Sequence, residues 1–237
     1  MYIAKGSEQW KTAEHVIILC HDICGPRAGY TQARADELAA SCGAAVVMPD
    51  FFHGTTLLVA PDDSWLAWLR LYVGFPAALY TCRTRFHWRA IGADFDATLN
   101  ALRSDATVGA LGFCFGGWVV LRASSNARLA CAAAGHSALE LTRVHGESLE
   151  ALLNDVACPQ MFLQCKNDPS LAKAGGLAQR VLDTKSFGAD CVYHEYKNEK
   201  HGFITRGGAS ATQEPAKSDI DDAMHRFAAF FKKHLNL

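Results

Sequence analysis

Short apolar runs alternate with longer segments of helical periodicity along most of the chain. Most of the short runs are apolar on both faces, which is typical of parallel strands buried inside a sheet. We predict strands at residues 15–20, 44–48, 107–111, 129–133, 160–164 and 191–196. Apolar residues at helical spacing predict helices at residues 30–41, 87–103, 115–125, 171–187 and 215–235. The alternation predicts an α/β fold, in which a mostly parallel central sheet is flanked by helices.

One segment, residues 51–88, departs from this alternation. It mixes aromatic residues with Arg70, Arg83 and Arg85. Long ordered insertions in compact domains usually serve function, so one interpretation is a cap-like excursion over a substrate pocket. The other interpretation is a packed surface excursion without a role in binding.

The length of 237 residues fits one domain over residues 1–237, because a single core serves chains of up to about 250 residues. The formal net charge is −1 and no run of Lys and Arg occurs. Polyanion binding depends on clustered cations, so we do not expect a nucleic acid partner. The oligomeric state stays open.

Nine cysteines are scattered without the spacing of a disulfide framework, which favours a reducing, cytoplasmic location. The first six residues lack the basic start and apolar stretch of an export signal. No window is long and apolar enough to span a bilayer, so we expect no membrane partner.

The strongest chemical signal is Gly112-Phe113-Cys114-Phe115-Gly116-Gly117, between a predicted strand and a predicted helix. This G-x-C-x-G pattern is typical of a nucleophile elbow, with Cys where Ser is commoner. A thiol at a helix N-terminus is favoured as the thiolate, and the Phe115 N–H would face the oxyanion of an attacked carbonyl. The alternative is a Gly-rich tight turn with a buried cysteine.

A cysteine nucleophile needs a base and a group that orients the base, expected in the order nucleophile, acid, histidine. Asp168 follows the strand predicted at 160–164, and His201 follows the one at 191–196. His201 would deprotonate the thiol and later protonate the leaving group, while Asp168 fixes the imidazole tautomer. Each residue taken alone is more often a surface residue, and the order and spacing favour the catalytic interpretation.

The end of the first strong strand reads His21-Asp22-Ile23-Cys24-Gly25. The Ile23 N–H is our candidate for the second oxyanion donor, and Asp22 would then lie near Cys114, although a loop or capping role for Asp22 fits equally well. Cys20, His21 and Cys24 could suggest zinc, but a second ligand pair at matching spacing is missing. We therefore predict no metal.

Together these motifs resemble the dienelactone hydrolase family of α/β-hydrolases (carboxymethylenebutenolidase-like), and more closely its eukaryotic-type branch. The motifs that carry the resemblance are His21-Asp22-Ile23-Cys24-Gly25, Val46-Val47-Met48-Pro49-Asp50-Phe51-Phe52-His53-Gly54, the elbow around Cys114, Ala134-Gly135-His136, and Lys200-His201-Gly202-Phe203-Ile204-Thr205-Arg206-Gly207. The resemblance covers nearly the whole chain. It implies a minimal α/β-hydrolase fold, a Cys-His-Asp triad, a small ester or enol-lactone substrate, and no cofactor.

Matched residue by residue, the resemblance makes Cys114 the nucleophile, His201 the base and Asp168 the orienting acid. It places Asp22 beside the resting thiol, in a thiol-gating role. Bacterial members of the family hold a substrate carboxylate with arginines, and the nearest matches here are Arg83 or Arg85, and Arg206. Arg206 follows the histidine by five residues rather than four.

The leading hypothesis is a cysteine-dependent hydrolase that forms a thioester intermediate and releases it with water. A second hypothesis is a non-catalytic or redox-sensing homologue, because a thiol of low pKa is also suited to oxidation. A third is a carboxylesterase or thioesterase with a different acyl specificity, since the pocket and not the fold sets the substrate.

Overall fold

The structure is a computed structural model that describes residues 1–59, 65–206 and 216–237. In these residues seven strands form one sheet in the order β1-β3-β2-β4-β5-β6-β7. Their bounds are β1 Tyr2–Ile3, β2 His15–Cys20, β3 Ala45–Met48, β4 Thr107–Phe113, β5 Leu129–Gly135, β6 Gln160–Cys165 and β7 Val192–Tyr196. β1 pairs antiparallel with β3, and every other pair is parallel. The predicted α/β fold with a mostly parallel sheet is confirmed.

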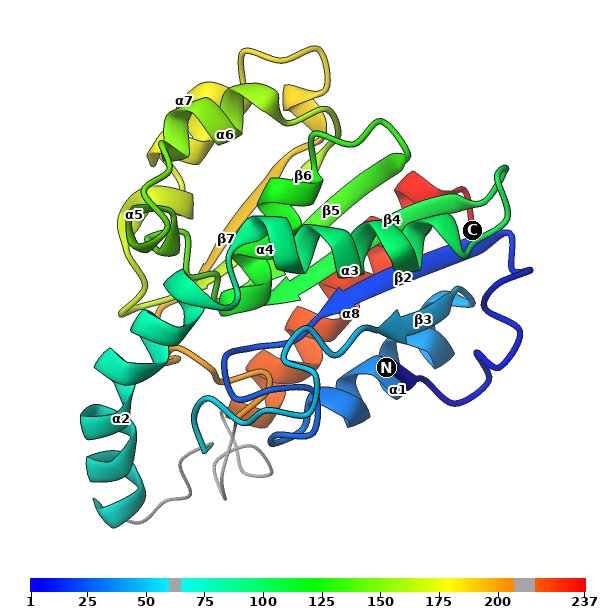
Figure 1. The fold of residues 1–237 in the computed structure, drawn as a ribbon. Helices are drawn as coiled ribbons and strands as arrows, with labels where there is room; N and C mark the ends of the chain where they lie inside the picture. The colour runs from blue at the N-terminus through cyan, green and yellow to red at the C-terminus, as the bar shows by residue number, and fades with distance from the viewer. Residues whose placement is uncertain (60–64, 207–215) are drawn as a thin grey trace.

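Helices cover both faces of the sheet (Figure 1). α1 (Thr31–Cys42) and α8 (Ala216–Leu235) pack on one face, while α3 (Trp88–Asn100) and α4 (Phe115–Ala123) pack on the other. The short helices α5 (Leu141–Val144), α6 (Leu149–Asp155) and α7 (Leu177–Leu182) lie toward the β7 edge of the sheet.

The alternation of side chains along β2 explains its unbroken apolar run. Val16, Ile18 and Cys20 belong to the core beneath α3 and α4. Ile17 and Leu19 belong to the core beneath α1 and α8. All five side chains are fully buried, because successive residues of a strand point to opposite faces and helices cover both faces here.

The six predicted strands are all present, with small shifts at their ends. The predicted helix at 171–187 is wrong as a continuous element. A 3₁₀ turn occupies Ser170–Ala172 and α7 spans only Leu177–Leu182, because Gly175 takes a φ of +76° and ends any helical run before α7. The predicted start of the last helix, Pro215, lies outside the described residues.

The excursion predicted at 51–88 contains a long helix, α2 (Trp65–Thr84). Its C-terminal half packs on the core through Ala78 and Cys82, whereas Tyr72, Val73 and Tyr80 are exposed. α2 extends away from the layered body of the molecule (Figure 1). Residues 60–64 of the excursion lie outside the described part.

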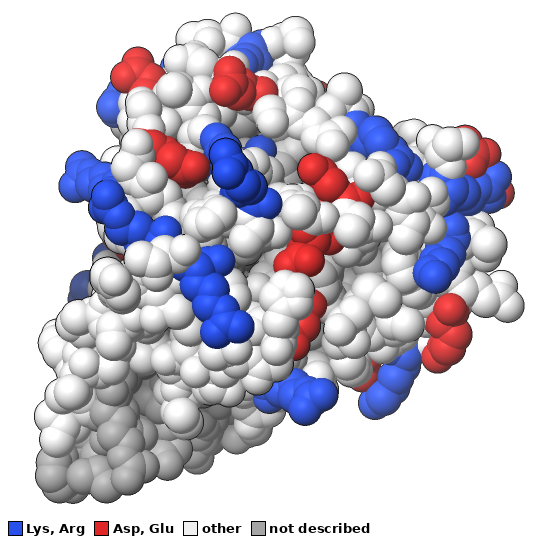
Figure 2. Space-filling model, in the orientation of Figure 1, with Lys and Arg blue, Asp and Glu red and all other residues white. Residues whose placement is uncertain are grey.

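The surface carries both signs of charge. On the face in Figure 2, basic and acidic side chains are interspersed. Among the described residues, no helix is both long and apolar enough to cross a membrane.

Candidate active site

The site is built around a sharp turn between β4 and α4. Cys114 joins the two elements with φ 53° and ψ −111°, a backbone conformation that is rare for a residue other than glycine. The turn brings backbone segments so close that a Cβ on Gly112 would lie 2.1 Å from the Gly116 carbonyl oxygen. A Cβ on Gly116 would lie 2.0 Å from the Cys20 carbonyl oxygen. The spacing of glycines around Cys114 is therefore a steric requirement of the turn.

Hydrogen bonds from neighbouring segments hold this strained residue in place. The Cys114 N–H donates to the Gly135 carbonyl at 3.2 Å, and the Ala138 N–H donates to the Cys114 carbonyl at 3.0 Å. α4 begins at Phe115, whose N–H belongs to the first turn and has no partner within the helix. The elbow that the sequence predicted is present, with its thiol at a helix N-terminus.

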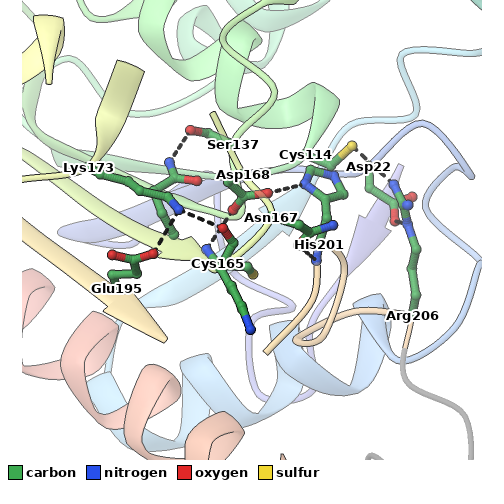
Figure 3. Close-up of polar contacts among 12 residues, drawn as sticks. Asp22, Cys114, Ser137, Cys165, Asn167, Asp168, Lys173, Glu195, His201 and Arg206 are labelled. Carbon is green, nitrogen blue, oxygen red and sulfur yellow. Dashed lines mark hydrogen bonds and ion pairs between the residues drawn. The ribbon is translucent and has the colours of Figure 1, made fainter. Parts of the chain in front are cut away.

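Asp168 and His201 are brought together by the loops after β6 and β7. The His201 Nδ1–H donates to Asp168 Oδ1 at 2.6 Å (Figure 3). The second carboxylate oxygen accepts from the Cys165 N–H at 2.7 Å, and the Asp168 side chain is fully buried. Asn167 Oδ1 accepts from the His201 N–H at 2.8 Å. The histidine is thus fixed through both its ring and its backbone.

Arg206 approaches the thiol from the opposite side to Asp168. Its Nη2 lies 3.0 Å from Cys114 Sγ and its Nε donates to Asp22 Oδ2 at 2.9 Å (Figure 3). Asp22 also accepts from the Cys24 N–H at 2.8 Å and from the Thr205 hydroxyl at 3.3 Å. Asp22 therefore reaches the thiol through Arg206.

Two positive groups favour ionisation of the Cys114 thiol. Burial disfavours the thiolate, but the charges of His201 and Arg206 and a hydrogen bond with His201 outweigh burial, so the pKa of Cys114 lies below its ordinary value. Burial also disfavours a charged His201, yet the thiolate and Asp168 raise the pKa of His201 to about 10. Both shifts favour a thiolate–imidazolium pair. By contrast, burial raises the pKa of the Cys20, Cys24 and Cys82 thiols.

A pocket of about 240 Å³ opens beside these groups. Most of its wall is apolar, and its lining residues are Ile23, Phe75, Leu79, Cys114, Phe115, Ala138, Glu140, Leu141, Asn167, Asp168, Pro169, His201 and Arg206. Both candidates for the oxyanion donors, Ile23 and Phe115, belong to this lining. Phe75 and Leu79 bring α2 into the wall, so part of the excursion does border the pocket.

Arg83 and Arg85 do not belong to the lining of this pocket. The Arg83 guanidinium donates to the Val144 carbonyl at 3.2 Å, and the Arg85 guanidinium lies over the Phe86 ring. Arg206 does line the pocket, but it is bound to Asp22 and Cys114. The structure therefore does not bring Arg83 or Arg85 into the pocket. A carboxylate-binding role for the three arginines stays a prediction.

Sequence reasoning assigned no role to two residues of the site, Glu140 and His136, although His136 belongs to one of the motifs that carry the family resemblance. His136 follows β5 with a φ of +37° and its ring packs edge-on against His201, with 5.1 Å between the ring centroids. Burial, followed by the charges of His201 and Arg206, lowers the pKa of His136 well below its ordinary value. The available signal was position, because His136 follows a strand just as Cys114 and Asp168 do, and the carboxyl ends of parallel strands meet at one edge of a sheet.

His21, considered above as a zinc ligand, uses both ring nitrogens within the protein. Nδ1 bonds the Asp22 carbonyl at 2.8 Å and Nε2 accepts from the Phe51 N–H at 3.2 Å. This ring links the loop after β2 to the segment after β3. Within the described part of the chain, no group of three His, Cys, Asp or Glu side chains is arranged to hold a metal ion.

Comparison with protein families gives one decisive match. The model of the dienelactone hydrolase family matches residues 2–235. The chain belongs to the dienelactone hydrolase family. Membership identifies this dienelactone hydrolase homologue as a hydrolase of ester bonds. No curated protein sequence matches the chain.

Several solved structures share the fold of this family member. A dienelactone hydrolase from Anabaena variabilis shares 13% identity, with a TM-score of 0.56 and coverage of 98% of this chain and 89% of that one. A metagenome-derived lipolytic enzyme shares 16% identity, with a TM-score of 0.59 and coverage of 94% and 95%. An acylaminoacyl peptidase from Pyrococcus horikoshii shares 16% identity at a TM-score of 0.59, with coverage of 95% and 38%. At these identities the likeness concerns the fold.

Proposed function

We propose that this family member hydrolyses a small ester or lactone through a covalent thioester on Cys114, with His201 and Asp168 as base and orienting acid. The observation that carries the proposal is the position of Cys114. It is held at a strained elbow at a helix N-terminus, next to two positive groups that lower its pKa. None of the cysteines whose thiol pKa burial raises has this combination of features.

In the first half of the reaction, the Cys114 thiolate attacks the ester carbonyl carbon and a C–S bond forms. The carbonyl oxygen becomes an oxyanion, and the N–H groups of Ile23 and Phe115 are the candidate donors to it. When the oxyanion collapses, the C–O bond to the leaving group breaks. The His201 imidazolium gives its proton to the departing alkoxide, which leaves a thioester and a neutral imidazole.

In the second half, water resolves the thioester. The negative charge of the thiolate is a main reason for the raised pKa of His201. Acylation removes that charge and so lowers the pKa of His201, and the neutral imidazole can now act as a base. It takes a proton from water, the hydroxide oxygen attacks the thioester carbon, and the C–S bond breaks. The carboxylic acid is released and the thiolate–imidazolium pair is restored. Asp168 holds Nδ1–H throughout at 2.6 Å, which keeps Nε2 as the reacting nitrogen.

The test is the intact mass of the protein during brief exposure to para-nitrophenyl acetate, with turnover followed in parallel. We expect a transient adduct of one acetyl group on the wild type, decaying as product forms, and neither adduct nor turnover with Cys114→Ala. Cys191→Ala is the matched control, because Cys191 is the one cysteine of intermediate exposure, and it should acylate like the wild type. Unchanged turnover with Cys114→Ala would refute the proposal.

A second candidate function, redox sensing, is favoured by the same low pKa of Cys114. The thiols of Cys24 and Cys82 lie close enough to interact with its charge. Dilute peroxide should then produce a Cys114 sulfenate or a disulfide at concentrations that leave the other thiols intact. Efficient hydrolysis that depends on Cys114 would refute a purely sensing role.

A further inference from the structure

One side of α2 exposes a row of apolar side chains to solvent. The row consists of Leu69, Tyr72, Val73 and Tyr80, which are 50%, 80%, 73% and 70% exposed. Their spacing, at i, i+3, i+4 and i+11, puts all four on one side of the helix. Ala78 and Cys82, which α2 buries in the core, lie on the opposite side at this spacing. We call the four exposed residues the outer face of α2.

An exposed row of this kind indicates an interaction site. Apolar side chains that are scattered singly over a surface need no explanation, whereas a contiguous apolar patch marks a place where a partner binds. The outer face belongs to a helix that extends away from the layered body of the molecule (Figure 1). The core cannot cover the outer face, because the core packs against the other side of α2.

The charge around the outer face narrows the choice of partner. Residues 64–93 contain four arginines and no Asp or Glu, although the whole chain has a formal net charge of −1. Arg83 follows Tyr80 by about one helical turn and so extends the outer face, and Arg85 comes directly after α2; both side chains are exposed. In Figure 2 the lower left of the molecule, where α2 lies, has no acidic side chain among its described atoms. A matching partner is negatively charged and accepts apolar side chains.

An anionic lipid surface has both properties. Arginines at such a surface contact the charged headgroups, while aliphatic and tyrosine side chains enter the region beneath the headgroups. A second copy of this chain fits less well, because a twofold contact puts the same patch on both sides. Residues 64–93 of that copy would offer no carboxylate to the facing arginines.

We propose that the outer face of α2 binds the surface of an anionic lipid bilayer, with Arg83 and Arg85 at the headgroups. Phe75 and Leu79 of the same helix line the pocket that contains Cys114, so binding holds the pocket close to the lipid. Among the described residues no helix is able to cross a membrane, and a helix that lies in the surface does not need to cross it. The expectation of no membrane partner rests on the missing spanning segment, and surface binding is compatible with that. The proposal does not depend on the chemistry of Cys114.

The experiment measures co-sedimentation of the protein with sucrose-loaded vesicles, made either of phosphatidylcholine alone or of equal parts phosphatidylcholine and phosphatidylserine. We expect the wild type to bind the mixed vesicles about tenfold more tightly or better, since each arginine near an anionic surface adds to the attraction, and added salt to weaken this binding. Tyr72→Ser combined with Val73→Ser should reduce binding about tenfold, because the double variant removes apolar area that enters the lipid. Arg83→Gln should reduce binding to the mixed vesicles about fivefold.

Leu237→Ser and Arg180→Gln are the matched controls, and both should bind like the wild type. Leu237 is 42% exposed and lies beyond α8. Arg180 is exposed on α7, and its guanidinium donates to a backbone carbonyl as that of Arg83 does. Circular dichroism verifies that each variant is folded.

Two results would overturn the proposal. One is a wild type that does not sediment with the mixed vesicles, and the other is equal binding by the outer-face variants and the controls. Sedimentation velocity then tests the second copy as the occupant. A wild-type dimer that the double serine variant makes monomeric, without vesicle binding, would assign the outer face to a contact between two copies instead of a lipid surface.

Discussion

The Arg206 guanidinium lies between Cys114 and Asp22, with Nη2 3.0 Å from the thiol sulfur and Nε 2.9 Å from the carboxylate. One cation is therefore shared by two anionic groups inside a buried site. Asp22 fixes the guanidinium in the plane that reaches the sulfur, and the guanidinium in turn stabilises the thiolate. Asp22 is in this sense a positioning residue for Arg206.

Loss of this cation should make the thiol less acidic. We predict that Arg206→Met lowers the rate of alkylation of Cys114 by iodoacetamide at neutral pH by roughly tenfold or more, because less of the thiol is ionised. The measurement is the alkylation rate between pH 5 and pH 10, followed by mass. The inflection should move to higher pH in Arg206→Met and stay in place in the control Arg89→Met, since Arg89 is exposed on α3. Superimposable profiles would show that Arg206 does not support the thiolate.

The raised pKa of His201 predicts an unusual pH dependence. In the proposed mechanism the imidazolium protonates the leaving group. Burial disfavours the charged ring, but the thiolate and Asp168 raise the pKa of His201 to about 10. Acylation by alkyl esters, whose alkoxide needs this proton, should hold across neutral pH and decline as the pH rises through about 10. Because the pKa of Cys114 is lowered, the rate should not fall as the pH drops through the ordinary thiol value.

Esters with two different leaving groups separate the effect of His201 ionisation on the rate from the effect of Cys114 ionisation. Para-nitrophenolate departs without a proton, so para-nitrophenyl esters should show little of the alkaline decline seen with the alkyl esters of the same acid. Single-turnover rates across the pH range, measured for both esters, provide the comparison. A decline centred near the ordinary histidine pKa for the alkyl ester would contradict the thiolate–imidazolium pair.

Asp168 should be needed for catalysis but not for folding. Asp168→Asn keeps the shape of the side chain but favours the wrong imidazole tautomer, and we expect kcat to fall by roughly 10²–10⁴-fold with the fold intact. The residue Asp155, which precedes β6 and is exposed, offers the matched control. Asp155→Asn should retain wild-type kcat and the same circular dichroism spectrum. Equal activity of the two variants would remove Asp168 from the mechanism.

The sequence predicted the strands and the residues that follow them, because both depend on local patterns. Cys114, Asp168 and His201 each come after a predicted strand, and parallel strands bring these positions to one edge of the sheet. The contact of Arg206 with the thiol depends instead on a turn. Gly202 has a φ of +94° and its carbonyl accepts from the Arg206 N–H at 2.8 Å, so the chain doubles back and counting residues from the histidine cannot locate the guanidinium.

Glu140 was not predicted as a site residue, because its position also depends on the path of the backbone and not on a local pattern. It lies in a short connection that shows neither strand nor helix periodicity, and its place in the pocket depends on how α2 and the loop after β6 pack around it. The predicted helix at 171–187 is wrong because the apolar spacing continues past Gly175 and Gly176, whereas the backbone turns there. Periodicity identifies buried faces, but it does not reveal a break imposed by one positive φ.

Gly116, which follows Cys114 by two residues, provides a test of how tightly α4 packs against β2 beneath the site. In Gly116→Ala the new Cβ would lie 2.0 Å from the Cys20 carbonyl oxygen, a backbone atom that cannot rotate away. α4 would have to move off the end of β2, and both Cys114 and the loop carrying Asp22 would shift with it. We expect a loss of several kcal/mol in the free energy of unfolding. Chemical denaturation followed by tryptophan fluorescence measures this loss.

Gly146→Ala distinguishes this clash from the ordinary cost of replacing a glycine. Gly146 has a φ of +71° and a Cβ there would meet no atom within 4 Å, so its replacement should cost only about 1 kcal/mol. A difference between the two variants therefore reports the close approach of α4 to β2 and not glycine's backbone entropy. If Gly116→Ala were as stable as Gly146→Ala and still active, the elbow would not require the tight contact that positions the thiol.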